Sequence, residues 1–213
     1  MMPFVSGGGG GGAVTFDPSH AFQIAFTNSN LTVANTSATA AYGNTKSTTS
    51  HTTGKYYIEA LIAADDGASN MMIGVCNGTW TAGSGAGHAI GSAGNNSIGL
   101  SDSGAWYINA VPTALLTAFT TQAGHIICMA VDLDHGKIWW RLDGVGYWNA
   151  NATYDPGTNT GGIDFSALGT PGSTAIFVAA ECETSSEKWT VNFGATSYAY
   201  AAPSGTNGTF GAW

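Results

Sequence analysis

The sequence predicts an all-β fold in which antiparallel sheets pack as a sandwich. The main observation is a hairpin whose apolar side chains alternate over residues 126–133 and 138–142, on either side of the turn Asp134-His135-Gly136. One face of this hairpin is too apolar to lie in water, so a second sheet must cover it. No long segment shows the period of a helix. On the first strand, the face to be covered consists of Ile127, Met129, Val131 and Leu133.

The return strand of the hairpin assigns its two tryptophans to opposite faces. Ile138, Trp140 and Leu142 alternate with Trp139 and Arg141. We therefore expect Trp140 in the core and Trp139 on the other face. Trp140→Ala is expected to unfold the domain, because truncating a buried Trp costs about 3 to 5 kcal/mol, whereas Trp139→Ala is expected to be tolerated.

Other segments show the same period of two. Residues 55–62 carry apolar side chains on both faces, which is typical of a central strand. Residues 188–193 alternate as well, with Trp189 on an apolar face and Lys188 on a solvated one. Residues 44–53 form a polar stretch to which we assign no strand. Further strands are expected at residues 22–26, 31–33, 71–76, 98–100, 105–108 and 176–180.

The chain divides into a glycine-rich segment, residues 1–12, and one β domain, residues 13–213. A length of 213 residues suits a single sandwich core. The run Gly7–Gly12 has no side chains to pack, so it is expected to act as a tether. Such a backbone can thread between subunits, which indicates a homo-oligomer or a larger assembly. The expected assembly anchor comprises Met1, Pro3, Phe4, Gly7 and Gly12.

The composition is poor in charge. Only 8% of residues are charged, and 5 Lys and Arg against 13 Asp and Glu give a net charge of -8. So few cations argue against nucleic acid and against an anionic membrane surface as partners. The first residues lack the basic and apolar regions of a signal peptide, and no stretch approaches the roughly 18 apolar residues of a membrane span. We expect no membrane insertion.

No motif indicates a metal or cofactor, and none is expected. The five histidines are scattered without the spacing of a zinc site. Gly83–Gly87 ends at His88, where a dinucleotide fingerprint needs glycine. Asp132 and Asp134 share a strand face and can in principle hold calcium, but carboxylates beside a turn more often accept backbone N–H groups.

Cysteine and acidic residues give no support for disulfides or for catalysis. Cys76, Cys128 and Cys182 lie far apart in apolar strand segments, so buried free thiols are expected. Glu181 and Glu183 are a candidate catalytic pair only through their proximity in the sequence. No Gly-x-Ser-x-Gly elbow is present. We therefore expect a protein that is not an enzyme.

Long loops at residues 79–96 and 149–173 carry or adjoin several aromatic residues. Aromatic rings edged by Asn and Asp groups suit a sugar face or a protein partner. The candidate partner-binding residues are Trp80, His88, Asp102, Trp106, Tyr147, Trp148 and Tyr154. We expect the three tryptophans of this set and Tyr154 to form one aromatic platform at an end of the sandwich. The alternative is that each ring folds back to cover that end.

Several segments, in order and spacing, resemble the SPRY domain. They are Gly54-Lys55-Tyr56-Tyr57-Ile58-Glu59, Ile73-Gly74-Val75, Gly124-His125-Ile126-Ile127, Val131-Asp132-Leu133-Asp134, Gly136-Lys137-Ile138-Trp139-Trp140 and Val191-Asn192-Phe193-Gly194. The flanking Thr15-Phe16-Asp17-Pro18, Asn30-Leu31-Thr32 and Pro203-Ser204-Gly205 look like the SPRY versions of bacteriophage and prophage virion proteins. The sequence departs from the family at His125, where Asp is usual, and at Asp143, where Asn is frequent.

The resemblance runs from about residue 15 to residue 206 and implies a bent two-sheet sandwich, similar to the concanavalin-like jelly roll. It also implies a non-enzymatic binding module that uses loops at one end of the sandwich. The phage type implies a fibre, spike or tail component of a virion, assembled in the host cytoplasm beside other virion proteins and recognising a host-surface glycan or protein. The alternative is a structural capsid or tail decoration protein whose loops contact neighbouring subunits, and the third possibility is a glycan depolymerase.

Overall fold

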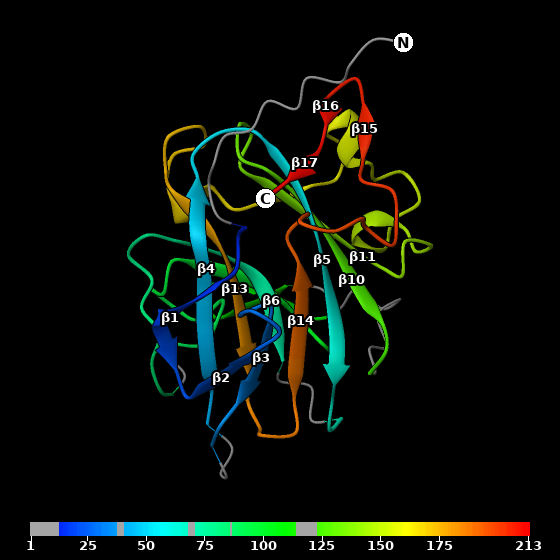
Figure 1. The fold of residues 1–213 in the computed structure, drawn as a ribbon. Coiled ribbons are helices and arrows are strands. Elements are labelled where there is room, and N and C mark those ends of the chain that lie inside the picture. The colour runs from blue at the N-terminus through cyan, green and yellow to red at the C-terminus, as the bar shows by residue number, and fades with distance from the viewer. Residues whose placement is uncertain (1–12, 38–40, 68–70, 86, 114–122) are drawn as a thin grey trace.

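The protein is a sandwich of two antiparallel sheets, as predicted (Figure 1). The computed structural model describes residues 13–37, 41–67, 71–85, 87–113 and 123–213. The segment 1–12, which holds the expected anchor residues, lies outside the described residues. Helical structure in the described part of the chain consists of three short 3-10 turns, η1 (Trp148–Ala150), η2 (Pro156–Thr158) and η3 (Ser166–Leu168).

The first sheet contains seven strands in the described residues, and every pairing in it is antiparallel. Its order is β1 (Phe16–Phe22), β4 (Gly43–His51), β13 (Ile176–Cys182), β6 (Met72–Asn77), β7 (Ser97–Ser101), β8 (Trp106–Ile108) and β9 (Val111–Thr113). The predicted pair of short strands on either side of Ser101 is therefore confirmed as β7 and β8.

The second sheet contains eight strands in the described residues. Its order is β12 (Ile163–Asp164), β11 (Lys137–Leu142), β10 (Ile126–Asp132), β5 (Lys55–Ala64), β14 (Lys188–Asn192), β3 (Thr32–Asn35) and β2 (Ile24–Thr27), with β17 (Gly211–Ala212) paired to β5. β5 pairs with β10 on one edge and β14 on the other, so the central strand expected from its two apolar faces is confirmed.

The start of β5 is completed by the other end of the chain. β14 ends at Asn192, which lies opposite Glu59, so β14 does not pair with the first residues of β5. There β17 runs parallel to β5, with Gly211 opposite Tyr56 and Ala212 opposite Tyr57. A short hairpin, β15 (Ser204–Gly205) with β16 (Gly208–Thr209), precedes β17 and lies at the red end of the ribbon in Figure 1.

The inner faces of the two sheets enclose the main core. Met129 of β10 is opposite Trp140 on β11 and opposite Ile58 on β5, and all three are fully buried. Trp189 of β14 is buried in the same core. The predicted inner face of the hairpin is thus confirmed. Cys76, Cys128 and Cys182 are buried and unpaired, as expected.

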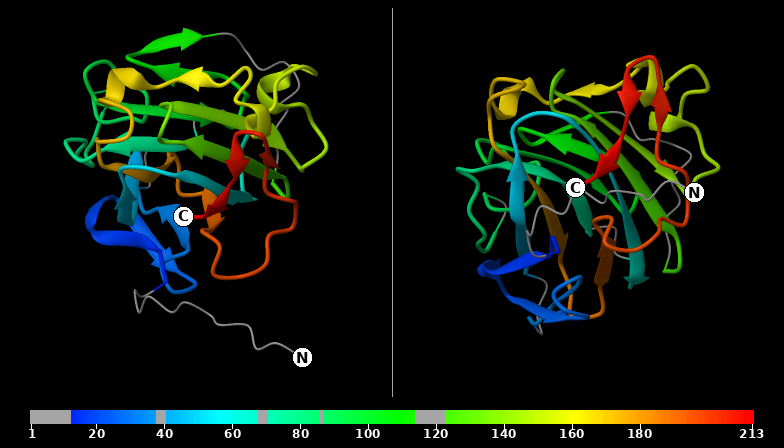
Figure 2. Two further views of the ribbon diagram at one scale, coloured as in Figure 1. Left: turned by 90° about the horizontal axis from the view of Figure 1, so that it is seen from above. Right: turned by 45° about the horizontal axis from the view of Figure 1, so that its top comes forward.

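Trp139 is as deeply buried as Trp140, and the expectation that it lies on an uncovered face is wrong. Its ring belongs to a second apolar cluster on the outer face of the eight-stranded sheet, and it meets the Phe210 ring edge-on with centroids 6.3 Å apart. Its Nε1 donates to the Thr160 carbonyl at 2.8 Å. The C-terminal segment therefore covers a face that the local pattern left open, as the two views of Figure 2 show.

β4 is the longest strand that the sequence pattern missed; β1, β9, β12, β15, β16 and β17 were not predicted either. Asn44, Thr45, Lys46 and Ser47 are all buried although they are polar. Their polar atoms find partners in other segments: the Thr45 hydroxyl donates to the Asp17 carbonyl at 3.2 Å, and the Ser47 hydroxyl accepts from the Val178 N–H at 3.1 Å. Because buried polar groups are tolerated once they are hydrogen-bonded, a polar stretch can form an interior strand here.

The loop at 79–96 lies against the outer face of the seven-stranded sheet. Asn44 and the Gly83 backbone exchange two hydrogen bonds, of 3.1 and 3.0 Å. The Ile90 N–H donates to Glu181 Oε2 at 2.8 Å. Burial is the main cause that raises the pKa of Glu181 to about 8. The loop is thus fixed by a buried amide and a buried carboxyl group and closes this outer face.

Candidate functional site

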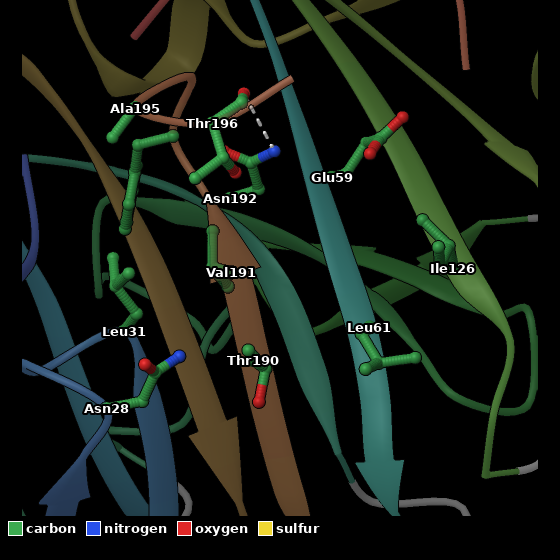
Figure 3. Close-up of a pocket in the computed structure, with 11 residues that line it drawn as sticks. Asn28, Leu31, Glu59, Leu61, Ile126, Thr190, Val191, Asn192, Ala195 and Thr196 are labelled. Atoms are coloured by element: carbon green, nitrogen blue, oxygen red, sulfur yellow. Dashed lines mark hydrogen bonds between the residues drawn. The ribbon is translucent and has the colours of Figure 1, made fainter. Parts of the chain in front are cut away.

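A groove crosses the outer face of the eight-stranded sheet over β10, β5 and β14 (Figure 3). Its volume is about 310 Å³. Asn28 and Leu31, in and after the turn that precedes β3, line one part of it, and Ala195 and Thr196, which follow β14, line another. The groove therefore lies between two connecting segments on top of a regular sheet.

The floor of the groove contains an apolar pair. Alternation along β5 sends Ile58 into the main core and leaves Leu61 on the outer face. The strand register places Ile126 of β10 opposite Leu61 on one side and Thr190 of β14 opposite it on the other. All three of these side chains are half-buried, so they present contact surface to the groove.

Glu59 is the carboxylate that lines the groove, and its oxygens are already engaged. Oε1 accepts from the Tyr57 hydroxyl at 3.0 Å and from the Tyr200 N–H at 2.8 Å, and Oε2 accepts from the Ala199 N–H at 2.8 Å. The side chain is 5% exposed. Glu59 therefore holds the segment after β14 against the sheet rather than presenting a charge to a ligand.

The other polar groups of the floor are engaged in the same way. The Asn192 amide donates to the carbonyls of Thr196 and Ser197, each at 3.2 Å, and its oxygen accepts from the Gly194 N–H at 2.9 Å. The hydroxyls of Thr190 and Thr32 are 2.7 Å apart and bond to each other. With these groups satisfied internally, the groove offers mainly apolar contact.

The predicted aromatic platform does not form. Trp80 is 2% exposed and packs with Cys76 and Ile90 on the outer face of the seven-stranded sheet. Trp148 is 8% exposed and packs in the cluster of Trp139 on the outer face of the eight-stranded sheet, with the Arg141 guanidinium 4.4 Å above its ring. Each ring covers a different outer face, so the two lie on opposite sides of the sandwich.

The remaining loop candidates are also dispersed. Trp106 is half-buried against the main core. The Nδ1 atom of His88 lies 3.1 Å from the Thr81 carbonyl, within its own loop. Asp102 is 3% exposed, and burial, followed by repulsion from Asp65, raises its pKa to about 7. None of these three side chains belongs to an open aromatic surface.

Tyr147 and Tyr154 are the predicted site residues with the most open surface. Tyr147 is 63% exposed and Tyr154 is 37% exposed. Tyr147 follows Val145, which is 88% exposed, so this loop presents two large apolar side chains to solvent. Contact of these two tyrosines with a partner stays a prediction.

The groove was not predicted from the sequence, although one signal of it was present. Residues 188–193 showed a solvated back, and Thr190 and Asn192 of that back line the groove. Leu61 was assigned to a covered face because its strand is apolar on both sides. What the pattern lacked was the extent of the covering segment, which reaches Glu59 through Ala199 and Tyr200 but leaves Leu61 half-buried.

The hairpin carboxylates Asp132 and Asp134 bind protein donors rather than forming an open calcium site. Asp132 accepts from the Asp134 and His135 N–H groups at 3.1 and 3.2 Å, and the Asn207 amide donates to it at 2.9 Å. The Lys55 ammonium lies 3.0 Å from Asp134, and the pKa of Asp134 is held below its ordinary value chiefly by the Gly54 N–H bond. The expectation that such carboxylates cap a turn is confirmed.

Among the residues that the structure describes, no three or more His, Cys, Asp or Glu side chains are grouped so as to hold a metal ion. Within the same ranges, no helix has the length and apolar character needed to cross a membrane.

The sandwich is a SPRY-like fold. No family model matches the sequence, and no curated protein matches it. Among solved structures, the SPRY domain of human HERC1 superposes with a TM-score of 0.58 at 14% identity, over 85% of this chain and 99% of that one. A further human SPRY domain gives a TM-score of 0.57 at 12% identity, over 83% and 99%.

The TRIM65 PSpry domain gives a TM-score of 0.56 at 17% identity, over 84% of this chain and 91% of that one. These identities are low, so the comparisons show a shared fold and not a shared ligand. They support the SPRY part of the sequence resemblance. They do not bear on the resemblance to the virion type of SPRY sequence.

Proposed function

We propose that this chain is a non-enzymatic binding domain and that its partner contacts the groove on the eight-stranded sheet. The carrying observation is the half-buried pair Leu61 and Ile126, left open on the outer face of the sheet beside the part that the C-terminal segment covers. Glu59 is the one carboxylate among the residues that line this groove, and hydrogen bonds already engage it. Hydrolysis of a glycan by paired carboxylates would need a second carboxylate there, so a depolymerase is the weakest candidate.

The chemistry of the groove favours a protein partner over a glycan. Recognition of a sugar ring needs free donors and acceptors around a flat aromatic face. Here the side chains of Thr190 and Asn192 form hydrogen bonds to other groups of the same chain. Trp80 and Trp148 are buried in other parts of the protein. An uncharged segment with apolar side chains matches what remains.

The wider role that we propose is a virion component, a fibre, spike or tail protein that recognises a host-surface protein. It is supported by the resemblance of Thr15-Phe16-Asp17-Pro18 and Pro203-Ser204-Gly205 to phage SPRY sequences, together with the glycine-rich segment 1–12 and the low charge. The virion is then the proposed location, after assembly in the host cytoplasm. Segment 1–12 is the proposed anchor to other virion proteins or to further copies of the chain.

A decoration protein that binds neighbouring subunits through its loops is the second candidate. The observation in its favour is the exposed pair Val145 and Tyr147 at one loop tip. An apolar loop tip of this kind is suited to contact with another subunit.

One pair of substitutions tests the groove against the loop tip. Leu61→Glu places a charge on the groove floor, and Val145→Glu makes the same kind of change at the 88% exposed tip. We expect Leu61→Glu to lower the affinity for host cells at least about tenfold, a loss of about 1.4 kcal/mol, with Val145→Glu close to wild type. The reverse pattern would favour the decoration role, and unchanged binding in both would refute the groove.

Treatment of the host surface separates the two ligand classes. Protease treatment of the cells should abolish adsorption if the partner is a protein, whereas periodate oxidation of surface sugars should leave it unchanged. Melting temperatures of both variants are measured alongside, because a fold lost in Leu61→Glu would make its adsorption uninformative. Leu61 is half-buried and lies outside the main core, so we expect its change to cost no more than about 1 kcal/mol.

A further inference from the structure

A second cavity adjoins the groove at the point where the described chain begins. Its volume is about 200 Å³, and its lining includes Ala13, Val14 and Trp213. It shares Phe193 and Ala195 with the groove, so the two hollows are neighbours along one surface. The residues that precede Ala13 therefore leave the domain beside the groove.

Those preceding residues have an uneven composition. Residues 1–5 are Met-Met-Pro-Phe-Val, all apolar and without a charged side chain, and residues 7–12 are glycine. An apolar stretch of this kind gains free energy when it leaves water, and a glycine run permits almost any path back to the domain. The segment thus combines an apolar tip with a connection made of glycine.

The connection is long enough for the tip to reach the groove. Six extended residues span at most about 20 Å, and the second cavity shares Phe193 and Ala195 with the groove. A short flexible linker also gives its end an effective concentration of about 1 mM near the attachment point. The chain's own tip therefore outcompetes the tip of another copy unless the protein itself is about as concentrated.

The chemistry of tip and groove matches. The groove floor offers Leu61 and Ile126, and its one carboxylate, Glu59, is buried and hydrogen-bonded. A charged side chain would be desolvated there without a partner, whereas apolar side chains carry no such desolvation cost. Phe4 has the largest apolar area in residues 1–5 and contributes most to such docking.

We propose that residues 1–5 dock into the groove of their own chain in the free subunit and so compete with the outside partner. The proposal rests on the groove of the proposed function and names an internal occupant for it. It concerns the subunit before assembly, when segment 1–12 has no neighbour to engage. If at least half of the chains hold the tip in the groove, its removal strengthens partner binding by about twofold or more, since only the open fraction binds.

The test uses the full chain and its Phe4→Asp variant, with Phe4→Leu as the matched control. Methyl resonances of Leu61 and Ile126 are compared by NMR with that of Ile90, which lies on the outer face of the seven-stranded sheet. We expect Phe4→Asp to move the first two and not the third, Phe4→Leu to leave all three close to wild type, and the synthetic peptide of residues 1–6 to restore the wild-type positions in Phe4→Asp. No shift at Leu61 and Ile126 in Phe4→Asp would overturn the proposal.

Three further outcomes test this proposal or separate it from the proposed function. Wild-type shifts that change as the protein is diluted would mean that the tip comes from a second copy, which overturns docking within one chain. If the methyl resonances move as expected but Leu61→Glu adsorbs normally to host cells, docking stands and the proposed function fails. If Leu61→Glu loses adsorption while Phe4→Asp moves no methyl resonance, docking fails and the proposed function stands.

Discussion

The two outer faces of the sandwich are covered in different ways. On the seven-stranded sheet, one loop lies flat and is fixed by buried polar groups, the Asn44 amide and the Glu181 carboxyl. On the eight-stranded sheet, the C-terminal segment packs through aromatic rings such as Phe210 on Trp139 and is held by the buried Glu59 carboxylate, but it stops short of Leu61. Both covers combine apolar rings with a buried, hydrogen-bonded carboxyl group, so the difference between the two faces lies in where the covering segment ends. The groove is the part of the second face that this segment leaves open.

The largest effect is expected for Trp139→Ala, which removes a ring from the cover of the eight-stranded sheet. Trp139 fills the outer cluster of the eight-stranded sheet and is fully buried, so we expect the free energy of unfolding to fall by about 3 to 5 kcal/mol, as much as for Trp140→Ala. Denaturant unfolding of the two variants measures the comparison. Val145→Ala, at a solvent-exposed site, serves as the control and should change stability by less than about 0.5 kcal/mol. A Trp139→Ala protein as stable as that control would show that the C-terminal cover is not part of the stable fold.

The next test concerns the polar cover of the seven-stranded sheet and its dependence on pH. Burial raises the pKa of Glu181 from an ordinary 4.5 to about 8, so the folded protein binds this proton more tightly than the unfolded one. The contribution of protonated Glu181 to the free energy of unfolding is fully present below pH 4.5 and is lost as the pH rises through about 8. The pKa values of Asp102 and Glu187, each raised to about 7, act in the same direction.

Glu181→Gln removes the largest of these contributions, because an amide imitates the uncharged carboxyl at every pH. We expect the variant to be more stable than wild type above pH 8 by a few kcal/mol, at about 1.4 kcal/mol per unit of pKa shift, and similar to it below pH 4.5. Urea unfolding across this range provides the measurement. Parallel pH profiles for the two proteins would mean that Glu181 does not titrate as its burial implies.

The smallest effect is expected at the polar contact that supports the C-terminal hairpin. The Asn207 amide donates to Asp132 at 2.9 Å and to the Pro156 carbonyl at 3.0 Å. Asn207→Ala should lower the free energy of unfolding by about 1 to 2 kcal/mol, since buried Asp132 loses one donor and keeps the others. Asn151→Ala is the matched control, because that exposed side chain bonds only within its own turn. Equal losses in both variants would remove any special role for the hairpin contact.

Periodic strands were predictable from the sequence. The alternation in β10 and β11 identified the inner face of the hairpin, and the apolar faces of β5 identified a central strand, because burial imposes a period of two wherever a face meets the core. β4 was missed because its buried side chains are polar. Their partners, Asp17 for Thr45 and Gly83 for Asn44, lie far away in the sequence, and no local pattern records them.

The site was less predictable than the fold. An aromatic residue in a loop has the same local sequence whether it faces a partner or covers a sheet, and Trp80 and Trp148 cover sheets. The groove depends on where a segment more than a hundred residues from β5 ends its contact with the sheet, which is a property of the folded chain. The solvated side of β14 was the one local sign of it.

The pairing of β17 with β5 also bears on the order in which the molecule is made and folded. During synthesis, β5, β10 and β11 leave the ribosome well before residues 204–213, so Trp139 and the edge of β5 near Tyr56 are without their cover during that interval. An unpaired strand edge beside an apolar face is the kind of surface on which nascent chains associate. We therefore expect this sheet edge to be open to association with other chains until β17 is in place.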